Sequence, residues 1–320
     1  MLKVLYLPLG DQPGMVRAFQ AIGADLTVFN FMAEHSAMGK AHVENKLVEL
    51  VSKLQPDICH MQLQMTNSID PAAILRAKEA SPGTIFTNWS GDIRKSPDRY
   101  FVSTSRAVDF SLISNVGQID LYKGAGGANI CYWQIGYDPV RVKPLNKTNF
   151  KWKVAFAANA HQDNIFPDAR LRKTIMQTLR ERFGNDAGLF GGGHAANLRI
   201  SSCSQQQVND VYNNSLTVVS VSNFNDVSHY FSDRLLDCVG SGRPTIAYRF
   251  PGIDSYFADR GDILVANSVE EIVELVNYCA SNVEYANKVG RNGSIKALAE
   301  HTFTSRVLEL VSMVGLSGKL

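Results

Sequence analysis

The residue types and spacing that best suit chemistry lie in the segment 228–244, SHYFSDRLLDCVGSGRP. Ser232 and Asp233 favour the start of a helix, and the glycines that follow favour its end. The unpaired N–H groups and the dipole at the start of a helix bind anions such as a diphosphate. Arg234 would add a charge-assisted contact, and Asp237, one turn further on, would accept hydrogen bonds from ribose hydroxyls. The alternative is a capped core helix in which Arg234 and Asp237 form a local ion pair.

Three further polar side chains follow predicted strands or glycine turns. His60 ends the strand PDICH, Asp92 lies in the turn SGD after the strand GTIFTNW, and His194 follows the glycines at 191–193. Glycines let the backbone approach a ligand closely, so His194 is a candidate for lining a binding pocket. Each position also has a structural interpretation: a satisfied core histidine at 60, ordinary turn chemistry at 92 and a flexible turn at 194.

Gly10, Asp11 and Gln12 form the first predicted loop between a strand and a helix, on the side of a sheet where ligands bind. The chain has no GxGxxG sequence, so a dinucleotide cofactor is not expected. It also has no Asp-x-Asp, HExxH, P-loop or GxSxG sequence. Because no Asp-x-Asp would hold a metal on a diphosphate, we expect a helix N-terminus and Arg234 to neutralise the phosphates, with no essential metal and no cofactor.

These residues are carried by an alternation of short apolar runs and amphipathic segments. The apolar runs predict strands at 2–9, 24–31, 56–62, 83–89, 107–115, 129–135, 153–160, 187–193, 216–222 and 243–250. Apolar residues at helical spacing predict helices within 11–23, 41–54, 70–80, 168–183, 205–215, 231–242 and 268–281. Strands that alternate with helices predict parallel βαβ units in doubly wound sheets.

The composition is that of a folded α/β chain long enough for two domains. Its 320 residues fit two domains of about 150 residues each. Hydrophobic residues make up 45% and charged residues 19%, and the net charge of +2 gives no sign of binding nucleic acid by charge alone. No apolar run is long enough for a membrane span or a signal peptide. Because the five cysteines are scattered, we expect a reducing, cytoplasmic location and no zinc site.

The alternation restarts after YDPVRVKPLNKTNFKW, a polar segment with two prolines. We therefore expect two Rossmann-like domains, at 1–140 and 153–302, joined by a linker at 141–152 and facing each other across a cleft. Ligands of open parallel sheets bind beyond the carboxyl ends of the strands, which places a ligand site in that cleft. On pattern alone, this architecture fits glycosyltransferases, sugar epimerases and periplasmic-type binding proteins, and the last class would need a secretion signal.

The C-terminal part of the chain resembles a known family. The sequence SDRLLDCVGSGRPTIAYRFPGIDSYFADRGDILVANSVEEIVELVNYC is similar to the C-terminal signature of retaining group 1 glycosyltransferases, and most similar to the CgeB-like branch of spore-protein glycosyltransferases. The segments AEHTFTSRVLELV, ANICYWQIGYDPVRVKP and PDICH resemble the same branch more loosely. The resemblance implies the GT-B fold, in which a last helix, here within 303–320, often crosses back toward the N-terminal domain.

The resemblance also implies an activity: metal-independent transfer of a sugar, with retention of configuration, from a nucleoside diphosphate sugar to an acceptor hydroxyl. A UDP-sugar is the expected donor. Taken with the patterns above, the candidate donor-binding residues are Gly10, Asp11, Gln12, His194, Ser228, His229, Ser232, Arg234 and Asp237. The candidate catalytic residues are His60 and Asp92, near the acceptor, and Arg234.

The chain departs from the family pattern at two places. Relatives in the broader group carry two glutamates separated by seven residues, and these positions hold His229 and Asp237 here. The Arg and Lys pair expected after the first C-terminal strand is displaced into the next helix, at Arg170, Arg172 and Lys173. Two alternatives therefore stay open, a catalytically silent GT-B-like binding or structural protein and a nucleotide-sugar epimerase. The acceptor class also stays open among polysaccharide, lipid, protein, small molecule and modified DNA base.

Overall fold

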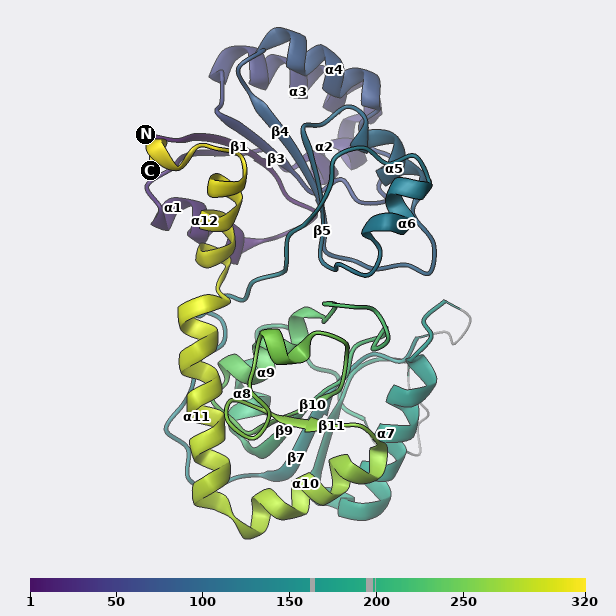
Figure 1. Ribbon diagram of the computed structural model, residues 1–320, viewed down its shortest axis with the longest axis vertical. Helices are drawn as coiled ribbons and strands as arrows, with labels where there is room; N and C mark the ends of the chain where they lie inside the picture. Colours follow the sequence, from purple (N-terminus) through teal and green to yellow (C-terminus); the bar gives the residue numbers. More distant parts are fainter. Residues whose placement is uncertain (162–164, 194–197, 199) are drawn as a thin grey trace. The chain divides into compact units, whose positions relative to one another are not determined.

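The computed structural model describes residues 1–161, 165–193, 198 and 200–320. The chain divides into two units: unit 1 contains Met1–Ile135 and Phe303–Leu320, and unit 2 contains Gly136–Thr302 (Figure 1). In the described residues each unit is built on one sheet, and every strand pair within it is parallel. The chain is therefore an α/β protein with two parallel sheets, as the sequence predicts.

The sheet of unit 1 has the strand order β2-β1-β3-β4-β5-β6. Its strands are β1 (Lys3–Leu7), β2 (Asp25–Val28), β3 (Ile58–Met61), β4 (Ile85–Ser90), β5 (Phe110–Ile113) and β6 (Ile130–Tyr132). The helices of this unit are α1 (Pro13–Ala21), α2 (Phe31–Met38), α3 (Lys40–Leu54), α4 (Pro71–Ala80), α5 (Arg99–Ser105), α6 (Ile119–Gly124) and α12 (Phe303–Met313), followed by a short turn of 3₁₀ helix, η4 (Ser317–Lys319).

The last helix of the chain belongs to the core of unit 1. Val307, Leu310 and Val311 of α12 are fully buried, and they share a hydrophobic cluster with Met15 and Phe19 of α1. Figure 1 shows α12 (yellow) beside α1 (purple), although the two helices come from opposite ends of the sequence. The first and last segments of the chain therefore depend on each other for burial of their apolar faces.

The sheet of unit 2 has the strand order β11-β10-β9-β7-β8. Its strands are β7 (Trp152–Ala157), β8 (Ala187–Phe190), β9 (Ser215–Ser220), β10 (Thr245–Tyr248) and β11 (Leu264–Ala266). The helices are α7 (Ala169–Phe183), α8 (Val208–Asn213), α9 (Asp233–Gly240), α10 (Val269–Ser281) and α11 (Val283–Glu300), with short 3₁₀ turns η1 (Gly184–Asp186) and η3 (Ile253–Ser255).

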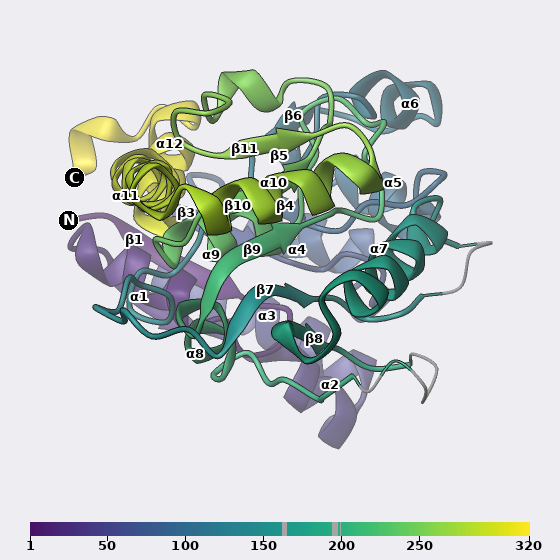
Figure 2. The ribbon, with the colours of Figure 1, turned by 90° about the horizontal axis from the view of Figure 1, so that it is seen from below.

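Two layers of helices cover the sheet of unit 2. Helices α7 and α10 contact each other and pack with the strands in the largest core cluster, and Figure 2 shows them side by side over the sheet. Helices α8 and α9 pack against β9 in a second cluster, and α11 lies against α9. Because the strands are parallel, their carboxyl ends share one edge of the sheet and their amino ends share the other. No described helix is both long and apolar enough to cross a membrane.

Candidate functional site

A pocket of about 280 Å³ opens at the carboxyl edge of the unit 2 sheet. Its walls come from the residues that follow β7 and β8, from the segment 203–212 and from the first half of α9. This is the edge at which open parallel sheets bind ligands, and the N-terminus of α9 brings unpaired N–H groups to it. All the described residues that line the pocket belong to unit 2.

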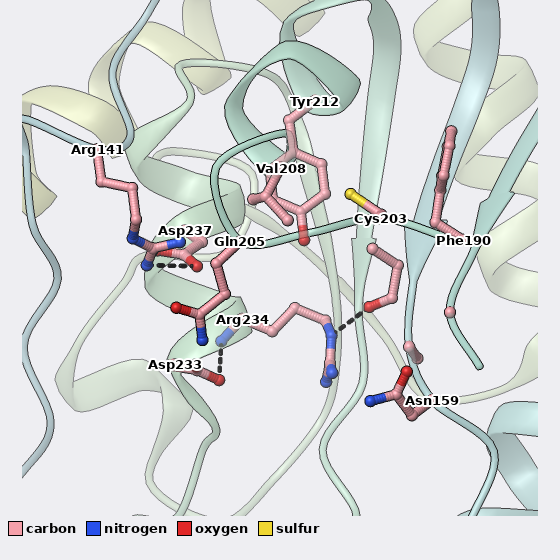
Figure 3. A pocket seen from close by; sticks show the side chains of 13 residues that line it. Arg141, Asn159, Phe190, Cys203, Gln205, Val208, Tyr212, Asp233, Arg234 and Asp237 are labelled. Atoms are coloured by element: carbon pink, nitrogen blue, oxygen red, sulfur yellow. Dashed lines mark hydrogen bonds and ion pairs between the residues drawn. The ribbon is translucent and has the colours of Figure 1, made fainter. Parts of the chain in front are cut away.

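Arg234, in the first turn of α9, reaches across the pocket toward the sheet. Its guanidinium Nε donates to the carbonyl of Ala157, at the end of β7, and its Nη1 donates to the carbonyl of Val221, after β9, at 3.2 Å. Nη1 also lies 3.3 Å from Ser232 Oγ. Figure 3 shows the guanidinium beside Asn159 on the pocket wall. The side chain is thus fixed against backbone carbonyls, with part of its surface exposed to the pocket.

A second arginine lies behind the first. Arg172, from α7, is 2% exposed, and its Nε and Nη2 donate to the same Val221 carbonyl at 2.9 and 2.7 Å. Burial lowers the pKa of Arg172, and the positive charge of Arg234 lowers it further. Two guanidinium groups therefore converge on one carbonyl oxygen at the end of β9.

Neither guanidinium has an anionic partner among the described residues of this unit. No carboxylate among the described residues lies within ion-pair distance of Arg172 or Arg234. Buried charges in proteins are usually paired, because an uncompensated charge in a low-dielectric interior is costly. Two adjacent cations beside a helix N-terminus form a local field that favours a bound anion, and Arg234, which lines the pocket, is the one that a diphosphate could contact.

Asp237, one turn after Arg234, is paired with a residue from the start of unit 2. Arg141 Nη2 lies 2.6 and 2.8 Å from the two carboxylate oxygens (Figure 3). Asp237 is 5% exposed, and burial raises its pKa to about 7 even though Arg141 acts in the opposite direction. A carboxylate offers about four lone-pair positions, so the pair leaves acceptor capacity for ribose hydroxyls.

The rest of the pocket is partly aromatic. Phe190, at the end of β8, and Tyr212, in α8, are both buried and both line the cavity, with Cys203 between them in Figure 3. Aromatic side chains next to a cationic site are suited to a ligand with one flat apolar part and one anionic part. A nucleoside diphosphate has both parts.

Ser228, His229 and Ser232 lie just before α9 but do not line this pocket. Ser232 is the residue that precedes the helix, as predicted, and its backbone N–H donates to Ser222 Oγ at 3.1 Å. His229 has a positive φ of 58°, and its Nδ1 lies 2.8 Å from Ser228 Oγ. Its ring also packs closely on Gly252, where an added Cβ would meet the imidazole at 2.8 Å. Contact of Ser228, His229 and Ser232 with a donor stays a prediction.

The interpretation of His60 as a catalytic residue near the acceptor is wrong on physical grounds. The side chain is 0% exposed within β3, where it stacks on Tyr6 and meets Trp133 edge-on. Its Nδ1 lies 2.7 Å from Thr87 Oγ1 on the neighbouring strand. Burial lowers the pKa of His60 to about 3, so the ring is neutral and has no surface to offer an acceptor.

The remaining predicted residues lie in unit 1 or outside the described residues. Asp92 follows β4 and is largely exposed, with Arg94 3.7 Å away. Gly10, with a φ of 73°, leads into Asp11 and Gln12 in the loop before α1. His194 falls outside the described residues. The roles assigned to these positions stay predictions.

The structure gives a place in or beside the site to residues that the sequence analysis did not list as candidate site residues. Arg141 lies in the segment predicted as a linker, and nothing local to it indicates a binding role. Arg172 belongs to the Arg and Lys residues that the sequence places in a helix, one segment later than the family pattern expects. In the structure its side chain reaches from α7 to the Val221 carbonyl. Phe190 and Tyr212 belong to runs that read as ordinary strand and helix core. Phe190 and Tyr212 line the same pocket only because the fold brings β8 and α8 together.

Comparison with protein families gives a match over the C-terminal part of the chain. Residues 171–312 match the family model described as glycosyl transferase-like. The matched stretch contains Arg172, Tyr212, Arg234 and Asp237, and it covers less than half of the chain. None of the curated proteins matches the chain.

Solved structures match over nearly the whole chain. The structure of Anabaena Alr3699/HepE in complex with UDP and glucose superposes with a TM-score of 0.64 at 12% identity, covering 100% of both chains. A glycosyltransferase from Rickettsia africae ESF-5 gives 0.66 at 11% identity over 98% of this chain and 97% of the other. Sucrose-phosphate synthase from Thermosynechococcus elongatus gives 0.61 at 11% identity over 98% of each. At these identities the likeness is one of fold, and it is the GT-B fold that the sequence predicts.

Proposed function

We propose that the chain is a glycosyltransferase that uses a nucleoside diphosphate sugar, with a UDP-sugar as the expected donor. The observation that carries the proposal is the pair of guanidinium groups at Arg172 and Arg234, which lack a carboxylate partner among the described residues and lie beside the N-terminus of α9. The family match over residues 171–312 supports the reaction class. The fold neighbour solved with UDP and glucose supports the choice of nucleotide.

In this proposal unit 2 holds the donor. The diphosphate lies against Arg234 and the first N–H groups of α9, the ribose bonds to Asp237, and the base contacts Phe190 or Tyr212. The diphosphate oxygen gains negative charge as its bond to the sugar breaks, so Arg234 acts mainly on kcat. Neutralisation by arginine and helix amides is the basis for proposing that no metal is needed.

We further propose that the transfer retains configuration and takes place in the cytoplasm. In a retaining reaction the departing phosphate oxygen can take the proton of the acceptor hydroxyl, so the burial of His60 does not prevent turnover. The five cysteines are free thiols, which suits a reducing compartment. The acceptor is a hydroxyl compound whose class is left to experiment.

The test is a calorimetric titration of the protein with UDP, GDP, ADP, dTDP and CMP sugars, each with and without EDTA. We expect one donor, a UDP-sugar, to bind with a saturable isotherm that EDTA does not change. Mass spectrometry then follows the bound donor with a panel of acceptors. Absence of binding by every donor would contradict the proposal, binding without turnover would indicate a silent binding protein, and an isomerised donor would indicate an epimerase.

A further inference from the structure

The amino edge of the unit 2 sheet carries a second cavity, of about 420 Å³. Its walls are the segment 144–150, the turn at Gly242 and Arg243, and one face of α11. Phe150 precedes β7 and Arg243 precedes β10, so this cavity and the donor pocket lie at opposite edges of the same sheet. The donor proposal makes no use of it.

The charges that line this cavity are all positive. Lys147, Arg243 and Arg291 contribute to its wall, and no described aspartate or glutamate does. Arg291 lies on α11 eight residues after Val283, a spacing that places both on one helix face. Val283 is the first residue of this helix, so the positive end of the α11 dipole also lies at the cavity. Together these features produce a positive field in a concave space.

Arg243 is the buried charged residue in the wall of this cavity. It is 8% exposed, and burial lowers its pKa. Its Nη2 donates to the carbonyls of Leu145 and Lys147 at 3.0 and 3.4 Å, and its guanidinium lies 4.8 Å from the centre of the Phe150 ring. Among the described residues, its buried Nε has no hydrogen-bond partner and no carboxylate forms an ion pair with it.

Arg172, at the opposite edge of the sheet, is likewise a buried arginine without an ion-pair partner among the described residues. A buried guanidinium that carries no anionic partner within the protein is stabilised when an anion from outside supplies the missing charge. Arg291 adds a second positive charge to the wall, and its exposed side chain makes no hydrogen bond or ion pair within the described part of the chain. The walls are not purely polar, because Pro144, Leu145 and Phe150 offer apolar contact to an organic group.

We propose that this cavity is a second binding site, separate from the donor pocket, for a small phosphate-bearing molecule. Its phosphate groups lie against Arg243, Arg291 and Lys147, and its organic part lies against the apolar wall. The proposal does not depend on the glycosyltransferase activity, because it rests only on the charge and burial at the amino edge of the sheet.

The test uses inorganic pyrophosphate as the probe on the full-length protein. Calorimetry measures its affinity at low ionic strength, and hydrogen exchange with mass spectrometry locates where it binds. We expect slower exchange in the segments 144–150 and 283–291, both in the natural protein and in Arg234→Gln, whose donor pocket is impaired. In Arg291→Gln we expect the affinity of this site to fall about fivefold, as for loss of one charge-assisted contact.

Lys288→Gln is the matched control, because Lys288 is exposed on the same helix but does not line the cavity. It removes one positive charge and is expected to leave the affinity unchanged. The proposal is overturned if pyrophosphate leaves exchange in 144–150 and 283–291 unaltered. It is also overturned if Arg291→Gln and Lys288→Gln weaken binding equally, since the effect would then come from overall charge.

Discussion

At the scale of single residues, the ionisation state of Asp237 determines how strongly the donor pocket can accept hydrogen bonds from a ribose. Burial raises the pKa of this carboxyl to about 7, Arg141 lowers it, and Asp233 raises it. The ionised carboxylate accepts hydrogen bonds from sugar hydroxyls, and the protonated form is a weaker acceptor. We therefore expect donor affinity to increase as the pH rises through about 7, measured by titration with UDP over a range of pH.

Replacing Arg141 with Met is predicted to move this pH profile upward. Without the guanidinium that contacts both carboxylate oxygens, burial raises the pKa of Asp237 further, so tight binding of UDP requires a higher pH. Arg141→Lys keeps the charge and is expected to shift the profile less. A profile that is the same in Arg141→Met and the natural protein would show that Asp237 does not govern ribose binding.

The same raised pKa has a consequence for folding. Because the folded-state pKa of about 7 lies above the ordinary value of 3.8, the contribution of Asp237 to the free energy of unfolding is fully present below about pH 3.8. It is lost as the pH rises through about 7, since the unfolded chain ionises more readily. Denaturant titrations at several pH values should show this slope in the natural protein and not in Asp237→Asn.

Arg234 is predicted to matter more for the rate than for the fold. Arg234→Ala should lower kcat with the best donor about 100-fold, as for loss of one preorganised contact to a charge that develops in the transition state. The control is Arg182→Ala, which removes an exposed arginine in the last turn of α7, outside the pocket, and should leave kcat unchanged. The measurement is steady-state turnover, with circular dichroism to check the fold. Equal rates in the two variants would remove Arg234 from the site.

At the scale of elements, some of the structure could be read from the sequence because local and tertiary preferences agree. The apolar run at 216–222 forms β9, and Ser232 precedes α9 as its residue type predicts. Helix α11 was not predicted, although it is 18 residues long, because Gly290 and Gly293 lower its intrinsic helix propensity. Tertiary packing explains both glycines, since each faces backbone at close range.

Gly290 therefore gives a prediction at the scale of an element. An alanine in a helix interior is usually more stable than a glycine by about 1 kcal/mol. At Gly290, however, an added Cβ would meet the Gly242 carbonyl oxygen at 2.5 Å and the Arg243 carbonyl carbon at 2.7 Å, which are backbone atoms with little freedom to move. We expect Gly290→Ala to lower the free energy of unfolding by about 1–3 kcal/mol in denaturant titrations.

Gly124→Ala is the control for this prediction. Gly124 lies at the end of α6, and no neighbouring atom lies within 4 Å of the position of an added Cβ. Its replacement should leave stability unchanged or raise it slightly. If Gly290→Ala behaved in the same way, α11 would have room to move away from the turn at Gly242, and packing would not explain the glycine.

At the scale of the whole molecule, the chain leaves unit 1 after Ile135 and returns to it at Phe303. The alternation of strands and helices was enough to predict two parallel sheets, because that pattern is local. The pairing of Arg141 with Asp237 could not be predicted, since it depends on where segments separated by 96 residues meet. Burial of His60 likewise depends on the aromatic residues that three other segments place around it.

Because residues 303–320 belong to unit 1, their deletion is predicted to unfold unit 1 and to leave unit 2 folded. Deletion of residues 303–320 removes the fully buried Val307, Leu310 and Val311, and it leaves the Trp133 Nε1 without the Arg306 carbonyl, which it contacts at 2.9 Å. We expect unit 1 to lose its stable fold, because each large buried side chain contributes about 2–5 kcal/mol. Hydrogen exchange should become fast in 1–135 while β7 and β9 of unit 2 stay protected. The control is Leu308→Ala, at an exposed position of the same helix, which should leave exchange in both units unchanged. If residues 1–135 stayed protected in the truncated chain, unit 1 would fold without α12.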